Sequence, residues 1–183
     1  MIGPAVLALL ALIVAGIVHL ASILAMPYLA PRDGMTRLAG LVSENRMSLL
    51  PDDEVRRLLP FADPSVAMAG CAYALDRGPV RVRLRTGSAP VGLVFLRKGA
   101  GVFHSLSDKA AVQGGLDVVL ATPAQMAIIR DRDTDDDPVQ EIRISSSDER
   151  GLVVVRALVP VPSMRAEVER LLSAASCDTE SLD

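Results

Sequence analysis

The feature that most constrains this chain is an uninterrupted apolar run near its start. Residues 4–26 contain only two polar side chains, His19 and Ser22. A helix rises about 1.5 Å per residue, so this run reaches roughly 34 Å, enough to cross a hydrocarbon core of about 30 Å. We therefore expect residues 1–30 to form a single-pass transmembrane anchor in a lipid bilayer.

Two other interpretations of the run remain open. A cleavable signal peptide usually has a basic start, a shorter apolar core of about 7–15 residues and small residues at its exit. Here residues 1–3 carry no basic side chain, and the best exit site, Ile23-Leu24-Ala25, has a bulky first position. A helix buried in a soluble core is the other alternative, although about 18 apolar residues in a row exceed what a small domain usually encloses.

Small and polar side chains recur along the run. Ala11, Ala15, His19 and Ser22 are spaced by four, four and three residues, which places them on one stripe of a helix. Such stripes let transmembrane helices approach closely and form hydrogen bonds, so we name these four residues as a candidate helix contact. The alternative is an ordinary alanine-rich helix with a neutral histidine near its exit.

Composition narrows the classes of function. Half of the 183 residues are hydrophobic, the net charge is −3, and aromatic side chains are scarce, with no Trp, two Tyr and three Phe. Nucleic-acid-binding proteins usually carry a basic surface and aromatic platforms, so we expect no nucleic-acid partner. The glycine motifs that bind phosphates or dinucleotides are absent, and no cofactor is expected.

The two cysteines, Cys71 and Cys177, have neither a CxxC partner nor the spacing of a metal site. In an exported domain they could form a disulfide that closes a loop of about 105 residues; two free thiols are the alternative. The membrane orientation is contested, because Arg32 and Arg37 after the run favour a cytoplasmic domain, whereas a disulfide favours export.

Residues 31–64 read as a juxtamembrane helix followed by a connecting segment. Pro27 and Pro31 should end the apolar helix, and Asp33 can cap a short helix that either lies along the membrane or covers the domain. Its apolar face would comprise Met35, Leu38, Leu41 and Val42. Prolines then punctuate residues 45–64, which we expect to wrap on the domain surface.

Residues 65–177 contain runs of strand-forming residues separated by turn signals, which predict a β-rich globular domain. We expect residues 178–183 to form a disordered tail. Turn signals pair the strands 66–75 with 80–85, 91–97 with 102–106, and 139–145 with 151–159 as hairpins, with a further strand at 116–121. Thr122 should cap a short helix, and Ser163 should cap a C-terminal helix with an apolar face. The expected class is α+β, mainly β: a small antiparallel barrel-like or curved sheet with the C-terminal helix packed on it.

An arginine row is the main candidate binding feature. Arg81, Arg83 and Arg85 alternate with apolar residues, and Arg97 and Lys98 lie on the next predicted hairpin. These cations could bind an anionic ligand or lipid headgroups, the alternative being an ordinary solvated strand face.

Two other constellations are weak. Asp131, Asp133 and Asp135 have the spacing of a calcium loop, but Asp136 follows where Gly is needed and Ile142 stands at the twelfth position. We therefore predict no metal site. His104 has serines nearby in sequence but no nucleophile elbow, and no catalytic residue is predicted.

Several motifs together resemble the short bacterial membrane-anchored proteins assigned to the domain of unknown function 1254. They are His19-Leu20 through Pro27, Pro31-Arg32-Asp33, Leu59-Pro60-Phe61-Ala62-Asp63-Pro64, Cys71-Ala72-Tyr73-Ala74-Leu75, Gly78-Pro79-Val80-Arg81-Val82, Val155-Arg156-Ala157-Leu158-Val159-Pro160 and Pro162-Ser163. The resemblance implies one anchor in the bacterial inner membrane, a β-rich periplasmic domain, pairing of Cys71 with Cys177, and a sister protein carrying a companion domain. It implies no catalytic residues.

Two hypotheses of function follow. The first is a non-enzymatic, membrane-tethered envelope domain that binds a protein partner or a small ligand. The alternative is an enzyme, or an accessory subunit of one, acting on an envelope substrate. A pocket in which polar groups converge around His104 would favour the alternative, whereas an exposed apolar surface would favour the first.

Overall fold

The computed structural model describes residues 3–29, 34–87, 89–97, 101–133 and 140–182. The side chains of Pro27, Tyr28 and Met35 lie outside this description, as do Pro31, Arg32 and Asp33, so the predicted cap and proline stop at 31–33 are not addressed. The chain separates into two compact units, Met1–Asp33 and Gly34–Asp183.

The described part of the first unit forms one long helix, α1 (Pro4–Leu29). It continues past Pro27, which therefore does not end the helix as predicted. None of its apolar window Pro4–Met26 is buried, so it is not the core helix of a soluble domain. By length and composition α1 can cross a membrane or serve as a signal sequence.

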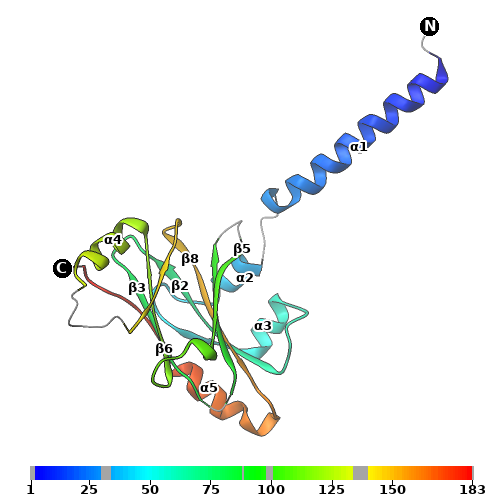
Figure 1. Ribbon diagram of the computed structural model, residues 1–183. Coiled ribbons are helices and arrows are strands. Elements are labelled where there is room, and N and C mark those ends of the chain that lie inside the picture. The colour runs from blue at the N-terminus through cyan, green and yellow to red at the C-terminus, as the bar shows by residue number, and fades with distance from the viewer. Residues whose placement is uncertain (1–2, 30–33, 88, 98–100, 134–139, 183) are drawn as a thin grey trace. The chain divides into compact units, whose positions relative to one another are not determined.

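The second unit contains two sheets (Figure 1). The five-stranded sheet is antiparallel throughout, whereas the four-stranded sheet contains one parallel pair, β6 with β7. In spatial order the first sheet is β1 (Ser48–Leu50), β2 (Val66–Ala74), β8 (Arg150–Leu158), β4 (Val91–Arg97) and β5 (Gly101–Ser107). The second is β7 (Ile142–Ser145), β6 (Gly115–Ala121), β3 (Val80–Arg85) and β9 (Ser176–Thr179).

The main core lies between the inner faces of these sheets. β3 shows why: Val80, Val82 and Leu84 are buried, while the arginines that alternate with them point to the other face. Tyr73 from β2 and Phe95 from β4 supply the largest buried side chains. Over the described strands the two sheets do not close on each other, so of the two predicted forms the curved, open arrangement is present and a closed barrel is not. The predicted class, α+β and mainly β, is confirmed.

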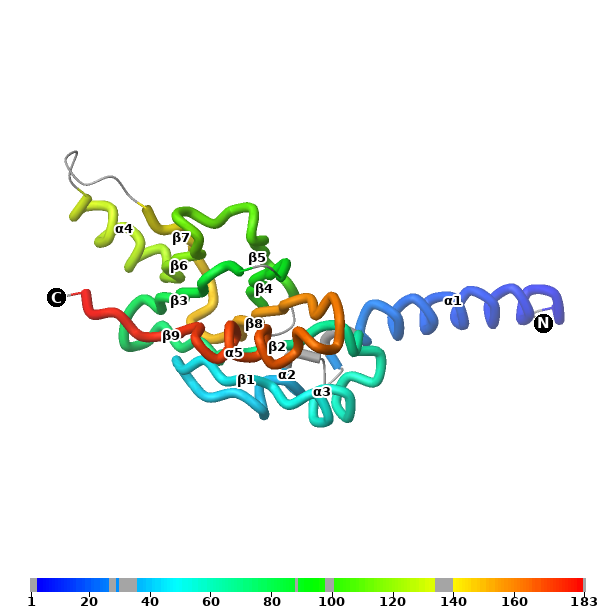
Figure 2. Tube along the Cα trace, turned by 90° about the horizontal axis from the view of Figure 1, so that it is seen from below, coloured from blue at the N-terminus to red at the C-terminus, as the bar shows by residue number. Residues whose placement is uncertain are grey.

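The C-terminal helix packs on this core, as predicted. α5 (Arg165–Ser173) buries Val168 and Leu172 and contacts β2 and β8, over which it lies in Figure 2. Its predicted cap is wrong: Ser163 lies in a preceding 3-10 turn, η2 (Pro162–Met164), and the cap position is Met164, whose side chain makes no capping hydrogen bond.

A second apolar cluster covers the outer face of the five-stranded sheet. Helices α2 (Gly34–Ala39) and α3 (Asp52–Leu58) contribute Leu38 and Val55, which pack with Met68, Leu152 and Val154. β2 and β8 are therefore buried on both faces. Of the two alternatives for this segment, the structure shows that it covers the domain, so the domain begins near Gly34 rather than at residue 65.

Strand pairing was predicted correctly for one hairpin only. β4 pairs with β5, but β2 and β3 belong to different sheets, and so do β7 and β8. Both predicted hairpins fail because the turns between these strands carry the chain across from one sheet to the other. A turn signal marks the reversal but does not say to which sheet the next strand belongs.

The C-terminal residues differ from their prediction, whereas the helix after β6 begins where it was predicted. The predicted tail at 178–183 is partly ordered, because β9 extends to Thr179 and pairs with β3, and Glu180 N donates to Pro79 O at 2.8 Å. The helix α4 (Pro123–Asp131) begins as predicted, with a reciprocal capping box between Thr122 and Gln125. Between β5 and β6 lies a short 3-10 turn, η1 (Asp108–Ala110).

Candidate functional site

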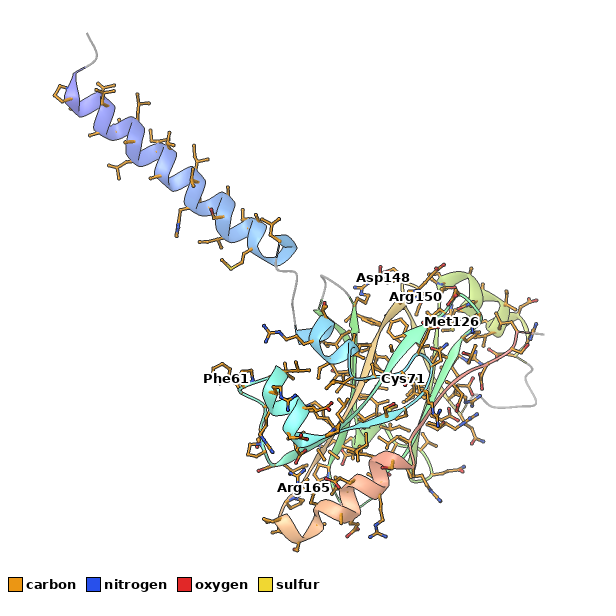
Figure 3. The ribbon with its side chains drawn as sticks, turned by 180° about the vertical axis from the view of Figure 1, so that it is seen from behind. Phe61, Cys71, Met126, Asp148, Arg150 and Arg165 are labelled. Carbon is orange, nitrogen blue, oxygen red and sulfur yellow. A yellow bond between two sulfur atoms is a disulfide. The ribbon has the colours of Figure 1, made fainter. Side chains whose placement is uncertain are left out.

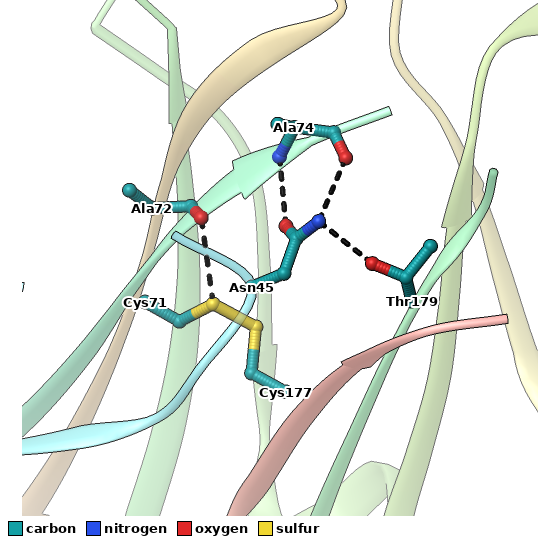
Figure 4. Close-up of a disulfide and its surroundings, with 6 residues drawn as sticks. All are labelled: Asn45, Cys71, Ala72, Ala74, Cys177 and Thr179. Atoms are coloured by element: carbon teal, nitrogen blue, oxygen red, sulfur yellow. Dashed lines mark hydrogen bonds between the residues drawn. A yellow bond between two sulfur atoms is a disulfide. The ribbon is translucent and has the colours of Figure 1, made fainter. Parts of the chain in front are cut away.

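The two cysteines meet at the junction of the sheets. Cys71 on β2 and Cys177 on β9 form a disulfide with a Cα–Cα distance of 6.5 Å and a sequence separation of 106 residues (Figure 4). The two residues are 0% and 1% exposed. The bond thus joins an inner strand of one sheet to the edge strand of the other.

Asn45 strengthens the same junction. Its side chain donates to Ala74 O at 3.0 Å and to Thr179 Oγ1 at 2.7 Å, and it accepts from Ala74 N at 2.8 Å (Figure 4). Its backbone N–H donates to Ala72 O at 2.8 Å. The residue adopts φ 46°, a conformation that Asn tolerates better than most residues. Sequence reasoning placed Asn45 in a connecting segment and missed this role.

The arginine row lies on the outer face of the four-stranded sheet, but its first member is neutralised. Arg81 donates to both carboxylate oxygens of Asp117, at 2.6 and 2.8 Å, and to Glu180 at 2.9 Å, with Glu141 at 3.8 Å. The hydrogen bond to Asp117 is the main cause that raises the pKa of Arg81. Arg81 therefore already has three carboxylates beside it, and its predicted anion-binding role stays a prediction.

Arg83 and Arg85 are more open. Arg83 lies 3.6 Å from both Asp117 and Glu180, and Arg85 is exposed with no ion pair among the described residues. Both line a cavity of about 320 Å³, the lower end of the range for small-molecule sites. Gln113 borders it, at φ 51° in a tight turn closed by reciprocal backbone hydrogen bonds between Val112 and Gly115.

Arg97 and Lys98, the other two cations named in the prediction, are not shown beside the arginines of β3. Arg97 belongs to the five-stranded sheet, where it contacts Asp148 at 3.4 Å and lies 4.8 Å from the centroid of Phe103. Lys98 lies outside the described residues. The structure therefore does not combine Arg97 with the arginines of β3.

The calcium-like spacing is used for an ion pair. Asp133 accepts two hydrogen bonds from Arg143, at 2.5 and 2.6 Å, and these bonds lower the pKa of Asp133. Asp135 and Asp136 lie outside the described residues. In the part of the chain that the structure describes, no group of three metal-ligating side chains is present.

His104 is exposed on β5, with its ring centroid 6.2 Å from that of Phe95. It makes no hydrogen bond or ion pair with any described residue, and it is not among the residues lining the Arg83–Arg85 cavity. The converging polar pocket that would indicate catalysis at His104 is thus not seen among the described residues.

A buried polar pair escaped sequence reasoning. Tyr73 Oη lies 3.3 Å from Ser146 Oγ, and each residue is 1% exposed. Burial is the main cause that raises the pKa of Tyr73. The Ser146 hydroxyl also donates to Asp148 O at 2.8 Å. Since neither oxygen reaches solvent, this pair satisfies buried polar groups rather than forming a nucleophile that a substrate could approach.

The predicted stripe on α1 does share one side of that helix. Ala11, Ala15, His19 and Ser22 lie along it with the neighbouring Leu7 and Val14. The Ser22 hydroxyl donates to Val18 O at 2.8 Å, so its proton is used within the helix.

Comparisons with known proteins address the fold alone. No protein-family model matches the chain, and no curated protein matches it in sequence. In fold it is similar to an uncharacterized protein from Burkholderia cenocepacia, with TM-score 0.51 and 10% identity over 75% of this chain and 35% of that one. It is also similar to a protein from Vibrio parahaemolyticus, with TM-score 0.53 and 11% identity over 79% of this chain and 32% of that one. The chain thus spans about a third of their length, and its resemblance to the domain of unknown function 1254 stays a prediction.

Proposed function

We propose that this protein is a single-pass, membrane-anchored envelope domain that acts by binding a protein partner. In this proposal α1 stays in the inner membrane of a bacterium, and the domain faces the periplasm. The observation that carries it is the buried disulfide between Cys71 and Cys177 in a chain that begins with an apolar helix. Structural disulfides persist in oxidising compartments such as the periplasm and are rare in the cytosol.

The disulfide supports one of the two orientations, with the domain in the periplasm. Basic residues after α1, such as Arg37, favour a cytoplasmic domain by the positive-inside rule. That rule is a bias on charge distribution, whereas a cytosolic domain would have to keep this bond oxidised against a reducing thiol pool. The disulfide lies within the domain itself, so it bears more directly on the compartment of the domain than the charges beside α1 do.

Retention of α1 is supported by the residues at its exit. The bulky side chain of Ile23 occupies the first position of the best cleavage site, where signal peptides have a small residue. A retained α1 makes the lipid bilayer the first partner of the protein.

A binding role is supported by one exposed aromatic side chain. Phe61, on the loop that follows α3, is 101% exposed (Figure 3). Aromatic residues are enriched at protein interfaces, which makes Phe61 a candidate contact for a partner. The partner we propose is the sister protein with a companion domain that the family resemblance implies.

A small anionic ligand is the second candidate, because Arg83 and Arg85 line a cavity of about 320 Å³. A carboxylate or phosphate group could accept hydrogen bonds from both guanidinium groups. Calorimetry with inorganic phosphate and citrate tests this idea, and equal binding by wild type and an Arg83→Ala/Arg85→Ala variant would remove it.

Anchoring is tested by expressing the full chain with a C-terminal tag in a bacterium and extracting the membranes with alkaline carbonate. We expect the protein to stay in the pellet, with an intact mass that includes residues 1–26. The matched variant Ile23→Ala creates a small-x-small exit and should therefore be cleaved to a shortened form more readily than the wild type. A wild-type protein that is already shortened and soluble would contradict the anchor.

A further inference from the structure

The four sheet edges of the domain differ in how they are protected. β1 has only three residues, and β9 is tied to the other sheet by Cys177 and by Asn45 through Thr179. β7 has four residues, one of which is the charged Arg143, and Glu141 directly precedes it. Short, charged or covered edges are the usual means by which proteins prevent strands from pairing with other chains.

β5 has much weaker protection. It has seven residues, Gly101–Ser107, and within the described residues it pairs only with β4. It contains no proline and no charged side chain. Val102 is 56% exposed, and His104 and Ser105 are also exposed.

One feature limits how far β5 can pair. The β4–β5 ladder shifts register between Phe95, which pairs with His104, and Leu96, which pairs with Val102. The regular part of the strand is therefore its second half, from His104 to Ser107, where each residue has one partner on β4. The backbone N–H and C=O groups on the outer side of this half remain able to bind another strand.

We propose that two copies of this chain associate by pairing β5 with β5 in antiparallel orientation, so that their five-stranded sheets continue into one another. The strand is neutral, so self-pairing opposes no like charges. Among the described strands, each copy has one such edge. Pairing in a two-fold dimer occupies this edge in both copies, so the contact does not propagate into a fibre.

The membrane anchor makes this small contact effective. A pair of such short strands buries less surface than a stable soluble dimer requires. Two copies held in one membrane meet at a high effective concentration, which compensates for the small area. The dimer in this form rests on the proposed anchoring by α1, and the small-residue side of α1 is compatible with two adjacent helices.

The first experiment is a cysteine scan in native membranes containing the full chain. Single cysteines replace His104, Ser105 and Ser107, with Ser173→Cys on the exposed side of α5 as the control. Copper phenanthroline is added to isolated membranes, and products are separated without reductant; the native cysteines are already paired. We expect a product of twice the monomer mass from β5 positions, strongest near the two-fold axis, and none from Ser173→Cys.

The second experiment distinguishes pairing from chance collision. Two differently tagged copies are co-expressed, and their co-purification is measured for Ser105→Lys alone, Ser105→Glu alone and the mixed pair. Like charges across the strands should reduce co-purification by about fivefold, and the mixed pair should restore it. Because Ser105 is exposed, both variants should keep the fold.

Several results would overturn the proposal. They are cross-linking no stronger at β5 than at Ser173→Cys, a product whose mass is not twice that of the chain, or equal co-purification of the three charge combinations. A product of another mass would assign β5 to a different protein. A carbonate-resistant protein that shows no β5 cross-link would leave the anchoring intact and refute the dimer alone.

Discussion

Removing the disulfide is the perturbation whose size the structure defines best. Cys71 and Cys177 are separated by 106 residues, and both are essentially fully buried. The chain-entropy relation for a loop of that size corresponds to about 4.8 kcal/mol at 25 °C. Since small proteins unfold at a cost of about 5–15 kcal/mol, the variant Cys71→Ala/Cys177→Ala should lose a large share of its stability.

Urea unfolding of the full chain in detergent micelles, followed by circular dichroism, measures this loss. With a slope of about 2 kcal/mol per molar urea, the midpoint should fall by about 2.4 M. Wild-type protein unfolded and refolded under reductant serves as the matched control and should unfold near the midpoint of the variant. A loss of less than about 1 kcal/mol in the free energy of unfolding would refute the reasoning, because removal of the disulfide would then add little conformational entropy to the denatured chain.

Three further predictions concern single residues. Asn45→Ala removes three side-chain hydrogen bonds at the sheet junction and should cost about 2–3 kcal/mol in urea unfolding. Asn45→Gly, which tolerates the positive φ, isolates the contribution of the hydrogen bonds, and an unchanged midpoint in both variants would contradict their role at the junction. Gly151→Ala places a methyl group against Tyr73 Oη and Leu96 O and should lower the free energy of unfolding by about 1–3 kcal/mol. Adding Tyr73→Phe to the same chain should recover part of that loss. Full stability of Gly151→Ala alone would be inconsistent with this packing. Arg143 lowers the pKa of Asp133 below its ordinary value of 3.8, so the ion pair stabilises the folded state above that pH, and this stabilisation is lost as the pH falls through the lower folded value. Arg143→Gln should therefore unfold at a higher pH than wild type in an acid titration. Coincident curves for the two proteins would exclude this contribution of the ion pair to stability.

Features that depend on neighbours in sequence could be predicted. Alternation of valine or leucine with arginine placed β3 correctly, with Val82 inward and Arg83 outward. The Thr122 cap was equally readable, because its partner Gln125 lies three residues away. In both cases the signal is local, and the fold confirms it.

Strand order could not be predicted from the same signals. β2 and β8 are covered on both faces, so they lack the alternation that shows which side of a strand faces the core. The covering helices lie in residues 34–64, a segment whose prolines resemble those of a linker. Burial by distant segments removed the pattern on which the assignment of hairpins depended.

The arginine row illustrates the same limit at a candidate site. Arg81 has the spacing of a solvent-exposed cation, but Asp117 and Glu180, which neutralise it, lie 36 and 99 residues further along the chain. No pattern among the sequence neighbours of Arg81 predicts these two carboxylate partners. Asn45 was missed for a similar reason, since Thr179, one of its acceptors, is 134 residues away.

The central claim is that the domain is held at a membrane on the oxidising side. The most direct measurement is the redox state of Cys71 and Cys177 in living bacterial cells. Cells are quenched with acid, the protein is denatured to expose its buried sulfurs, and a maleimide carrying a large polymer is added with or without prior reduction. A mass shift is expected only after reduction. Labelling of both thiols without reductant would contradict the disulfide and the periplasmic placement together.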